Sequence, residues 1–219
     1  LIMSVQIKNT PFPNDTKYQQ TFDKFPFELS DFQKWAIKAI HERKNTLITA
    51  YTGSGKTLPA EEAIRFYHNI GLKSIYCSPV KALTNEKYNS FRKKFTEISF
   101  GIFTGDNKDN PEADCLLMTT EILANNLNRN NNETQPGILD FNINYNTELG
   151  VVIFDEFQYL FSDRGSAWND CIVNLPNSVP IVALSATMSS PENVCKWLSK
   201  VTNKDTYLCP NYKRVVPLE

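Results

Sequence analysis

Two short polar segments of the sequence combine residue types that can do chemistry. The first, A-Y-T-G-S-G-K-T, spans residues 50–57 and follows a short apolar run. Its glycines lack the Cβ that would obstruct bound oxygens, so backbone N–H groups can close around a polyphosphate at the start of the next helix. The lysine can reach the terminal phosphates, and the last hydroxyl can bind Mg²⁺. The alternative reading is a glycine turn with a surface lysine. The predicted phosphate-binding residues are Thr52, Gly53, Ser54, Gly55, Lys56 and Thr57.

The second segment is an adjacent pair of acids, Asp155 and Glu156, directly after the apolar run 150–154. In a chain that also has a phosphate loop, one acid of such a pair can bind the metal ion and the other can handle a proton. We expect Asp155 to hold Mg²⁺ together with Thr57, and Glu156 to polarise the water that attacks the γ-phosphate. Read alone, the pair is equally compatible with a helix cap.

Gln158 follows the acid pair by two residues. Its side-chain amide is neutral and can donate and accept hydrogen bonds at once. We expect it to relay the state of the nucleotide to Ser185 or Thr187, which follow a later apolar run. The candidate catalytic residues are Lys56, Asp155, Glu156 and Gln158.

Apolar runs that alternate with helical patterns must position these segments. A run of five apolar residues before Asp155 is typical of a strand covered on both faces of a parallel sheet. The alternation predicts an α/β fold with a mostly parallel sheet flanked by helices. Ligands of such sheets gather at the carboxyl ends of the strands, where most of the polar clusters fall. The expected strands cover residues 47–50, 74–77, 99–103, 115–118, 150–154 and 181–184.

One amphipathic helix precedes the phosphate loop. Ser30 or Asp31 can cap it, and its apolar stripe is predicted to enter the core. Phe27 and Gln33 lie before or off that stripe, so they are free to stack on a base and to pair with its edge. The stripe consists of Phe32, Trp35, Ala36, Ala39 and Ile40.

Composition limits the class of protein. With 219 residues the chain is expected to fold as one domain, and a net charge of −1 leaves any nucleic acid to be held by local groups. The five scattered cysteines argue against a disulfide framework or a zinc site and favour a reducing, intracellular compartment, cytoplasmic or nuclear. No apolar run approaches the roughly 20 residues that span a bilayer, so we expect no membrane partner.

Composition also suggests internal boundaries. Residues 1–24 are polar and are predicted to form an N-terminal arm without a core of its own. Residues 25–206 form the expected domain, with an Asn-rich loop insertion at 125–147. Residues 207–219 are expected to form a final strand and a linker.

Eight sequence blocks occur in an order that resembles superfamily 2 helicases. The residues within these blocks are similar to those of the superkiller-type (Ski-like) DExH RNA helicases. The likeness extends from about residue 25 to the end of the chain. Two positions depart from the family pattern: Gln158 replaces the usual histidine, and Tyr51 replaces a common proline. The blocks are 27–37, 50–57, 79–88, 104–106, 118–123, 153–158, 164–168 and 183–188.

The resemblance implies a first RecA-like domain of the P-loop NTPase class that binds ATP and Mg²⁺, with Phe27 and Gln33 recognising adenine. It implies contacts to the backbone of single-stranded RNA without sequence preference, because phosphate contacts carry no sequence information. A second RecA-like domain in cis is expected, and the fragment alone is expected to be monomeric and weakly active. The implied nucleic-acid contacts are Pro79, Lys81, Thr104, Gly105, Thr119, Thr120 and Glu121.

Three other interpretations stay open at this stage. A DNA-repair helicase of the same superfamily would share most of these blocks, so DNA is an alternative partner. A non-catalytic, ATP-gated scaffold would not need the acid pair. A metabolic P-loop kinase fits poorly with the Ser185-Ala186-Thr187 segment.

Overall fold

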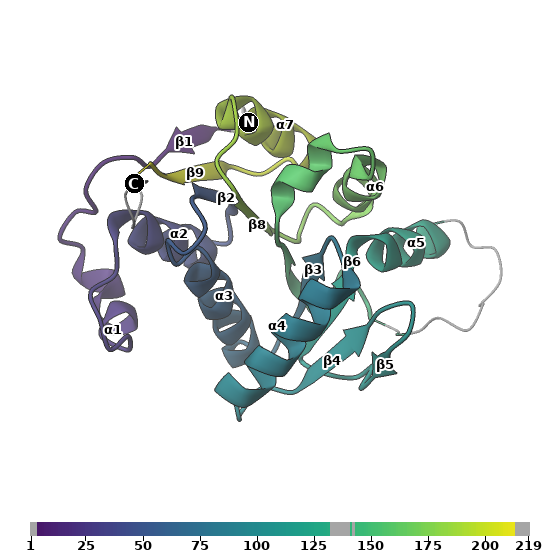
Figure 1. Ribbon diagram of the computed structural model, residues 1–219. Coiled ribbons are helices and arrows are strands. Elements are labelled where there is room, and N and C mark those ends of the chain that lie inside the picture. Colours follow the sequence, from purple (N-terminus) through teal and green to yellow (C-terminus); the bar gives the residue numbers. More distant parts are fainter. Residues whose placement is uncertain (1–3, 132–140, 142, 213–219) are drawn as a thin grey trace, which may run out of the picture.

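A single, mostly parallel β-sheet forms the centre of the protein (Figure 1). The computed structural model describes residues 4–131, 141 and 143–212. Within them the strand order is β1-β9-β2-β8-β7-β3-β6-β4-β5, and every neighbouring pair is parallel except β4 with β5. The α/β class expected from the sequence is therefore confirmed. The strands are β1 Val5–Ile7, β2 Asn45–Ala50, β3 Lys73–Ser78, β4 Phe100–Phe103, β5 Lys108–Asp109, β6 Cys115–Thr119, β7 Leu149–Phe154, β8 Ile181–Ser185 and β9 Thr206–Asn211.

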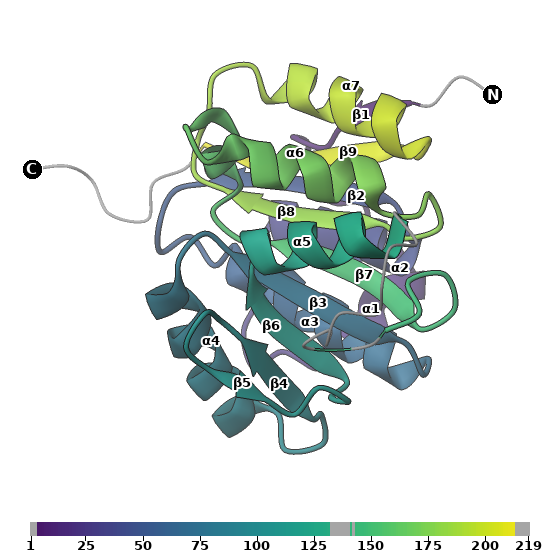
Figure 2. The ribbon, with the colours of Figure 1, turned by 90° about the vertical axis from the view of Figure 1, so that its right-hand side faces the viewer.

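Helices cover both faces of the sheet. Helices α2, α3 and α4 lie on one face, and α5, α6 and α7 lie side by side on the other (Figure 2). None of the helices in the described part of the chain is long and apolar enough to cross a membrane. The helices are α1 Gln19–Phe22, α2 Asp31–His41, α3 Thr57–Asn69, α4 Lys81–Lys94, α5 Thr120–Asn131, α6 Gly165–Asn174 and α7 Pro191–Thr202, with short 3₁₀ turns η1 Thr16–Tyr18 and η2 Phe157–Phe161.

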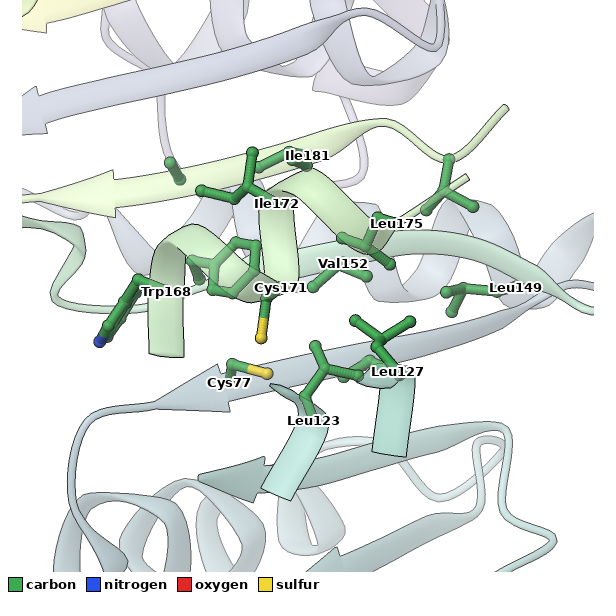
Figure 3. Close-up of a cluster of buried hydrophobic side chains, with 14 of the residues drawn as sticks. Cys77, Leu123, Leu127, Leu149, Val152, Trp168, Cys171, Ile172, Leu175 and Ile181 are labelled. Carbon is green, nitrogen blue, oxygen red and sulfur yellow. The ribbon is translucent and has the colours of Figure 1, made fainter. Parts of the chain in front are cut away.

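Strand β7 shows why the sheet needs both layers. Its side chains alternate between the faces, so Val152 and Phe154 enter the cluster under α5, α6 and α7, while Val151 and Ile153 enter the opposite one. The first cluster is drawn in Figure 3, where α5, α6, β3, β7 and β8 all contribute side chains. Trp168 of α6 is 1% exposed and packs on Phe154 with ring centroids 5.4 Å apart. Burial on both faces explains the unbroken apolar run.

The N-terminal segment corrects the predicted arm. Strand β1 pairs in parallel with β9 and so joins the main sheet. Ser4 fixes this edge, because its backbone N–H and its hydroxyl both donate to Asp205 Oδ1, at 2.9 and 3.0 Å. Tyr18 and Phe22 are buried in a small cluster with Ile37 of α2. Residue 24 is therefore no structural boundary among the described residues, since the segment before it contributes to both sheet and core.

The Asn-rich segment is also more ordered than expected at both ends. Helix α5 continues to Asn131, and Phe141, Ile143 and Tyr145 are buried against the core. The Tyr145 hydroxyl donates to Asn126 Oδ1 at 2.5 Å. The rest of the predicted loop, residues 132–140 and 142, lies outside the described residues. At the C-terminal end, the expected final strand is β9, and the predicted linker from residue 213 lies outside the described residues as well.

Candidate active site

Three adjacent strands bring the sequence-predicted chemical groups to one edge of the sheet. Strand β8 lies between β2 and β7, with Thr49 of β2 paired to Ser185 and Phe154 of β7 paired to Ala183. All three strands are parallel, so the loops that follow them emerge at the same carboxyl edge. These loops are the glycine loop after β2, the acid pair after β7 and the Ser185-Ala186-Thr187 segment at the end of β8. Chain segments more than 100 residues apart are thereby neighbours.

The glycine loop has the backbone of a phosphate cradle. Gly53 and Gly55 have φ values of +80° and +84°, which side chains rarely adopt. A Cβ on Gly55 would lie 2.6 Å from Gln33 Nε2, whereas the space beside Gly53 is open. The Lys56 side chain is only 8% exposed, and it directly precedes α3, which begins at Thr57. Buried Ser54 Oγ has no hydrogen-bond partner among the described residues, so an incoming phosphate oxygen fits this loop.

Gln33 is not free, contrary to the expectation that an off-stripe glutamine lies open to a base. It is 6% exposed, and its Oε1 accepts hydrogen bonds from the Ser30 backbone N–H at 3.0 Å and the Ser30 hydroxyl at 2.9 Å. Its Nε2 donates to the Gly55 carbonyl at 3.1 Å. Gln33 thus joins the start of α2 to the glycine loop. Phe27, the other predicted adenine contact, is 54% exposed and available for stacking.

Asp155 points toward the face of the sheet that carries α3. Alternation along β7 places it on the same side as Ile153, away from Phe154. Its Oδ2 accepts a hydrogen bond from the Tyr76 hydroxyl at 2.7 Å, and its Oδ1 accepts one from the Glu156 N–H at 2.9 Å. Burial raises the pKa of Asp155, while the Tyr76 hydrogen bond and the charge of Lys87 counter part of that rise. Two hydrogen bonds therefore hold the carboxylate in place and offset part of the cost of its burial.

Glu156 has a left-handed backbone with φ +51° and ψ +48°. A residue with a Cβ pays about 1–2 kcal/mol for this conformation, which turns the chain sharply at the end of β7. The Glu156 side chain accepts a hydrogen bond from Gln158 Nε2. The two carboxylates therefore have different partners, Tyr76 for Asp155 and Gln158 for Glu156.

Gln158 connects the acid pair to the end of β8. Its Oε1 accepts from the Ser185 hydroxyl at 3.1 Å and from the Ala186 N–H at 3.0 Å, while its Nε2 donates to Glu156. The expected contact with Ser185 is present. Thr187, the alternative partner, is exposed, and the backbone of Ala186 makes the second contact. No residue-type pattern could reveal a backbone contact of this kind.

A second group of polar segments occupies the neighbouring strands β3, β6 and β4. These strands adjoin in that order beyond β7, and Ser78 at the end of β3 pairs with Thr119 at the end of β6. Pro79 and Lys81 follow β3, and the Thr104-Gly105 turn follows β4. The predicted nucleic-acid residues therefore lie at the same carboxyl edge as the glycine loop and the acid pair. They follow β3, β6 and β4, whereas the nucleotide residues follow β2, β8 and β7.

Several of these predicted contacts are engaged within the protein. Thr104 is 1% exposed and its Oγ1 accepts from the Asn107 N–H at 3.1 Å, so its hydroxyl closes the turn. Thr120 is fully buried. Lys81 Nζ donates to Asp106 at 2.7 Å, close to the space beside Gly105, and Arg164 pairs with Glu121. Sequence reasoning gave Asp106 and Arg164 no role of their own, although both lie in the recognised blocks.

A sequence profile of the DEAD/DEAH box helicases matches residues 30–194. The chain belongs to this family. Helicases of the family use ATP, and the glycine loop, acid pair and Ser185-Ala186-Thr187 segment all lie within the matched residues. In the described part of this helicase domain, no group of three or more acidic, cysteine or histidine side chains is arranged to hold a metal ion.

Similar helicases include antiviral helicase SKI2 of Saccharomyces cerevisiae, at 38% identity over 89% of this chain and 14% of that protein. Human superkiller complex protein 2 is 36% identical over 88% of the chain and 14% of its own length. Human exosome RNA helicase MTR4 is 35% identical over 89% of the chain and 18% of its length. The helicase domain described here thus spans less than a fifth of these relatives.

The fold of this helicase domain is also found in a solved structure of the DUF1998 helicase MrfA bound to DNA. The two agree with a TM-score of 0.65 and 18% sequence identity, over 96% of this chain and 32% of MrfA. At this identity the likeness concerns the fold, which is a helicase fold of the RecA-like α/β type.

Proposed function

We propose that the chain is the ATP-hydrolysing first RecA-like domain of a superkiller-type RNA helicase. The observation that carries this proposal is the arrangement of β2, β8 and β7, which brings Lys56, Glu156 and Ser185 to one edge of the sheet. Neither a scaffold nor a turn with a surface lysine needs a positioned acid pair beside a phosphate cradle. In the longer protein, hydrolysis would drive movement along a single strand and unwinding.

The nucleotide would lie across the carboxyl ends of these strands. The backbone N–H groups of Gly53 and Gly55 and the hydroxyl of Ser54 suit a polyphosphate at the positive end of α3. Phe27 is available to stack on adenine, and Gln33, anchored to Ser30 and Gly55, fixes the loop beside it.

Magnesium would be held by Thr57 and Asp155. Thr57 begins α3, and Asp155 points to the face that α3 covers, so a hydroxyl and a carboxylate can converge there. Both are oxygen donors of the kind that Mg²⁺ prefers. When bound, Mg²⁺ would offset the negative charge of the terminal phosphates.

Glu156 is the proposed base. Its side chain is held by Gln158, whereas the Asp155 carboxylate is held by Tyr76. In that position Glu156 would accept the proton of the water that attacks the γ-phosphate, and Lys56 would stabilise charge on the phosphate oxygens.

The other half of the edge would hold single-stranded RNA by its backbone. The buried hydroxyls of Thr104 and Thr120 shape the turns, so the loop after β3, backbone N–H groups and the exposed side chain of Lys81 are the groups that face outward. Such contacts carry no sequence information. A second RecA-like domain in cis would complete the site, and the whole protein would act in the cytoplasm or nucleus.

The choice between RNA and DNA is tested by ATP hydrolysis in the longer protein, with poly(U) RNA or poly(dT) DNA added. The proposal expects RNA to stimulate hydrolysis more strongly, as the name of the exosome RNA helicase MTR4 suggests. Stimulation by DNA alone would support the DNA-repair interpretation. No hydrolysis with either polymer would support a scaffold.

The role of Gln158 leads to a separate prediction. Gln158→Leu removes both the donor to Glu156 and the acceptor for Ser185, so hydrolysis should fall by about tenfold, as expected from losing one or two hydrogen bonds to a charged group. ATP affinity should stay within about twofold, because the residues that bind the phosphates are unchanged. The measurement is kcat together with ATP binding at equilibrium.

Gln158→His provides the matched variant. An imidazole must be neutral both to donate to Glu156 and to accept from Ser185, and the ordinary histidine pKa is about 6.5. This variant should therefore keep activity at pH 8 and lose it as the pH falls below about 6, whereas the wild type should show no such loss between these values. Equal pH profiles, or full activity of Gln158→Leu, would remove the bridging role.

A further inference from the structure

Tyr76 occupies the middle of β3 and has no role in the sequence-based assignment. It is fully buried, and its ring packs edge-on against Phe91 of α4, with centroids 5.3 Å apart and planes at 82°. Its hydroxyl donates to Asp155 Oδ2 at 2.7 Å. A ring fixed between strand and helix gives this hydroxyl one position, so the hydrogen bond also fixes the carboxylate of Asp155.

The hydroxyl can act only as the donor in this contact. The ordinary pKa of tyrosine is about 10, so the buried phenol is protonated at neutral pH and donates to the carboxylate. The other oxygen of Asp155 is held by the Glu156 N–H at 2.9 Å. An ionised carboxylate has about four acceptor positions, so lone pairs on both oxygens remain after these two bonds.

The contact lies beside the start of α3. Burial raises the pKa of Tyr76, and the charge of Glu61, one helical turn after Thr57, adds to that rise. Tyr76 packs in one buried cluster with Ile153 of β7, Ala60 and Ala63 of α3, and Phe91 of α4. The tyrosine that holds Asp155 thus lies in the layer between the sheet and these two helices.

We propose that Tyr76 is a positioning residue, whose hydroxyl holds Asp155 in the orientation that receives Mg²⁺ with the nucleotide. The inference rests on the proposed function, since Asp155 is its metal-binding carboxylate. It adds a residue of the neighbouring strand β3 to the machinery. Groups that orient a metal-binding side chain typically contribute about 10–100-fold in metal affinity.

The test uses Tyr76→Phe, which removes only the hydroxyl and keeps the packing on Phe91. Binding of a fluorescent ADP analogue to the 219-residue chain is measured first in EDTA and then at increasing Mg²⁺ concentrations. Tyr76→Phe should bind the analogue as the wild type does in EDTA, and the Mg²⁺ midpoint should rise by about tenfold.

Tyr88→Phe is the matched control. It also removes a tyrosine hydroxyl that donates to an aspartate at 2.7 Å, but the acceptor is Asp109 of β5, at the far edge of the sheet. This variant should keep the wild-type Mg²⁺ midpoint. An equal shift in both variants, or no shift in either, would overturn the positioning role.

A double variant tests whether Tyr76 acts through Asp155. Asp155→Asn alone should raise the Mg²⁺ midpoint, and adding Tyr76→Phe should then change it by less than twofold. A further tenfold rise in the double variant would overturn the proposal. Loss of binding by Tyr76→Phe in EDTA as well would identify a structural role. If the wild type binds no analogue in either condition, the proposed function itself fails.

Discussion

Glu156→Gln is expected to lower kcat for ATP hydrolysis by at least about 10²-fold, the usual contribution of a general base. Glutamine keeps the size and the hydrogen-bonding reach of glutamate but cannot accept the proton of the attacking water. ATP affinity should change by less than about threefold, because the glycine loop and Lys56 are untouched. Single-turnover hydrolysis and equilibrium binding separate the two effects.

Glu97→Gln is the control for this variant. Glu97 is exposed in the connection between α4 and β4, which lies at the amino ends of the strands. The same chemical change there should therefore leave kcat unaltered. Normal turnover by Glu156→Gln would remove Glu156 from the base role. Loss of ATP binding in this variant would instead indicate that Glu156 shapes the nucleotide site.

Lys56→Ala is expected to weaken ATP binding by about 10²-fold, since charge-assisted hydrogen bonds contribute about 1.5–3 kcal/mol each. Lys56 is nearly buried and forms no salt bridge within the part of the chain that the structure describes, so phosphate is its natural partner. The thermal midpoint should not fall, because the variant removes an uncompensated charge from a buried position. Isothermal titration with ATP and a melting curve measure both quantities.

Lys93→Ala is the matched control for Lys56→Ala. Lys93 is exposed on α4, and its removal should change neither ATP affinity nor the melting curve. If Lys56→Ala bound ATP as the wild type does, the glycine loop would be a turn with a lysine of no special role. A large fall in its melting temperature would assign Lys56 to the fold.

The sequence was informative where local patterns carry the structure. The glycine loop requires positive φ, which Gly53 and Gly55 adopt, and the apolar run before Asp155 predicted a strand buried on both faces. Parallel strands share a carboxyl edge, so the meeting of the loop with the acid pair followed from the alternation of elements. The dual hydrogen-bonding capacity of the Gln158 amide predicted a link to Ser185 or Thr187, and the hydrogen bond with Ser185 is present.

Long-range contacts set the limit of that reasoning. The pairing of β1 with β9 joins residues 5–7 to residues 206–208, and no local period signals it. Gln33 lies off the apolar stripe, yet a capping contact with Ser30 and a donor bond to Gly55 bury it. Tyr76 lies in an apolar strand, so its sequence context predicts a core residue. Its hydrogen bond to Asp155 can be predicted only when the register between β3 and β7 is known.

The most direct test of the account is a crystal structure of the chain with Mg²⁺ and a non-hydrolysable ATP analogue. The account predicts triphosphate against the backbone of Gly53 and Gly55, with Mg²⁺ about 2.1 Å from the Thr57 hydroxyl and bound to Asp155 directly or through one water. A nucleotide at another part of the surface, or a metal ion that neither residue approaches, would contradict it.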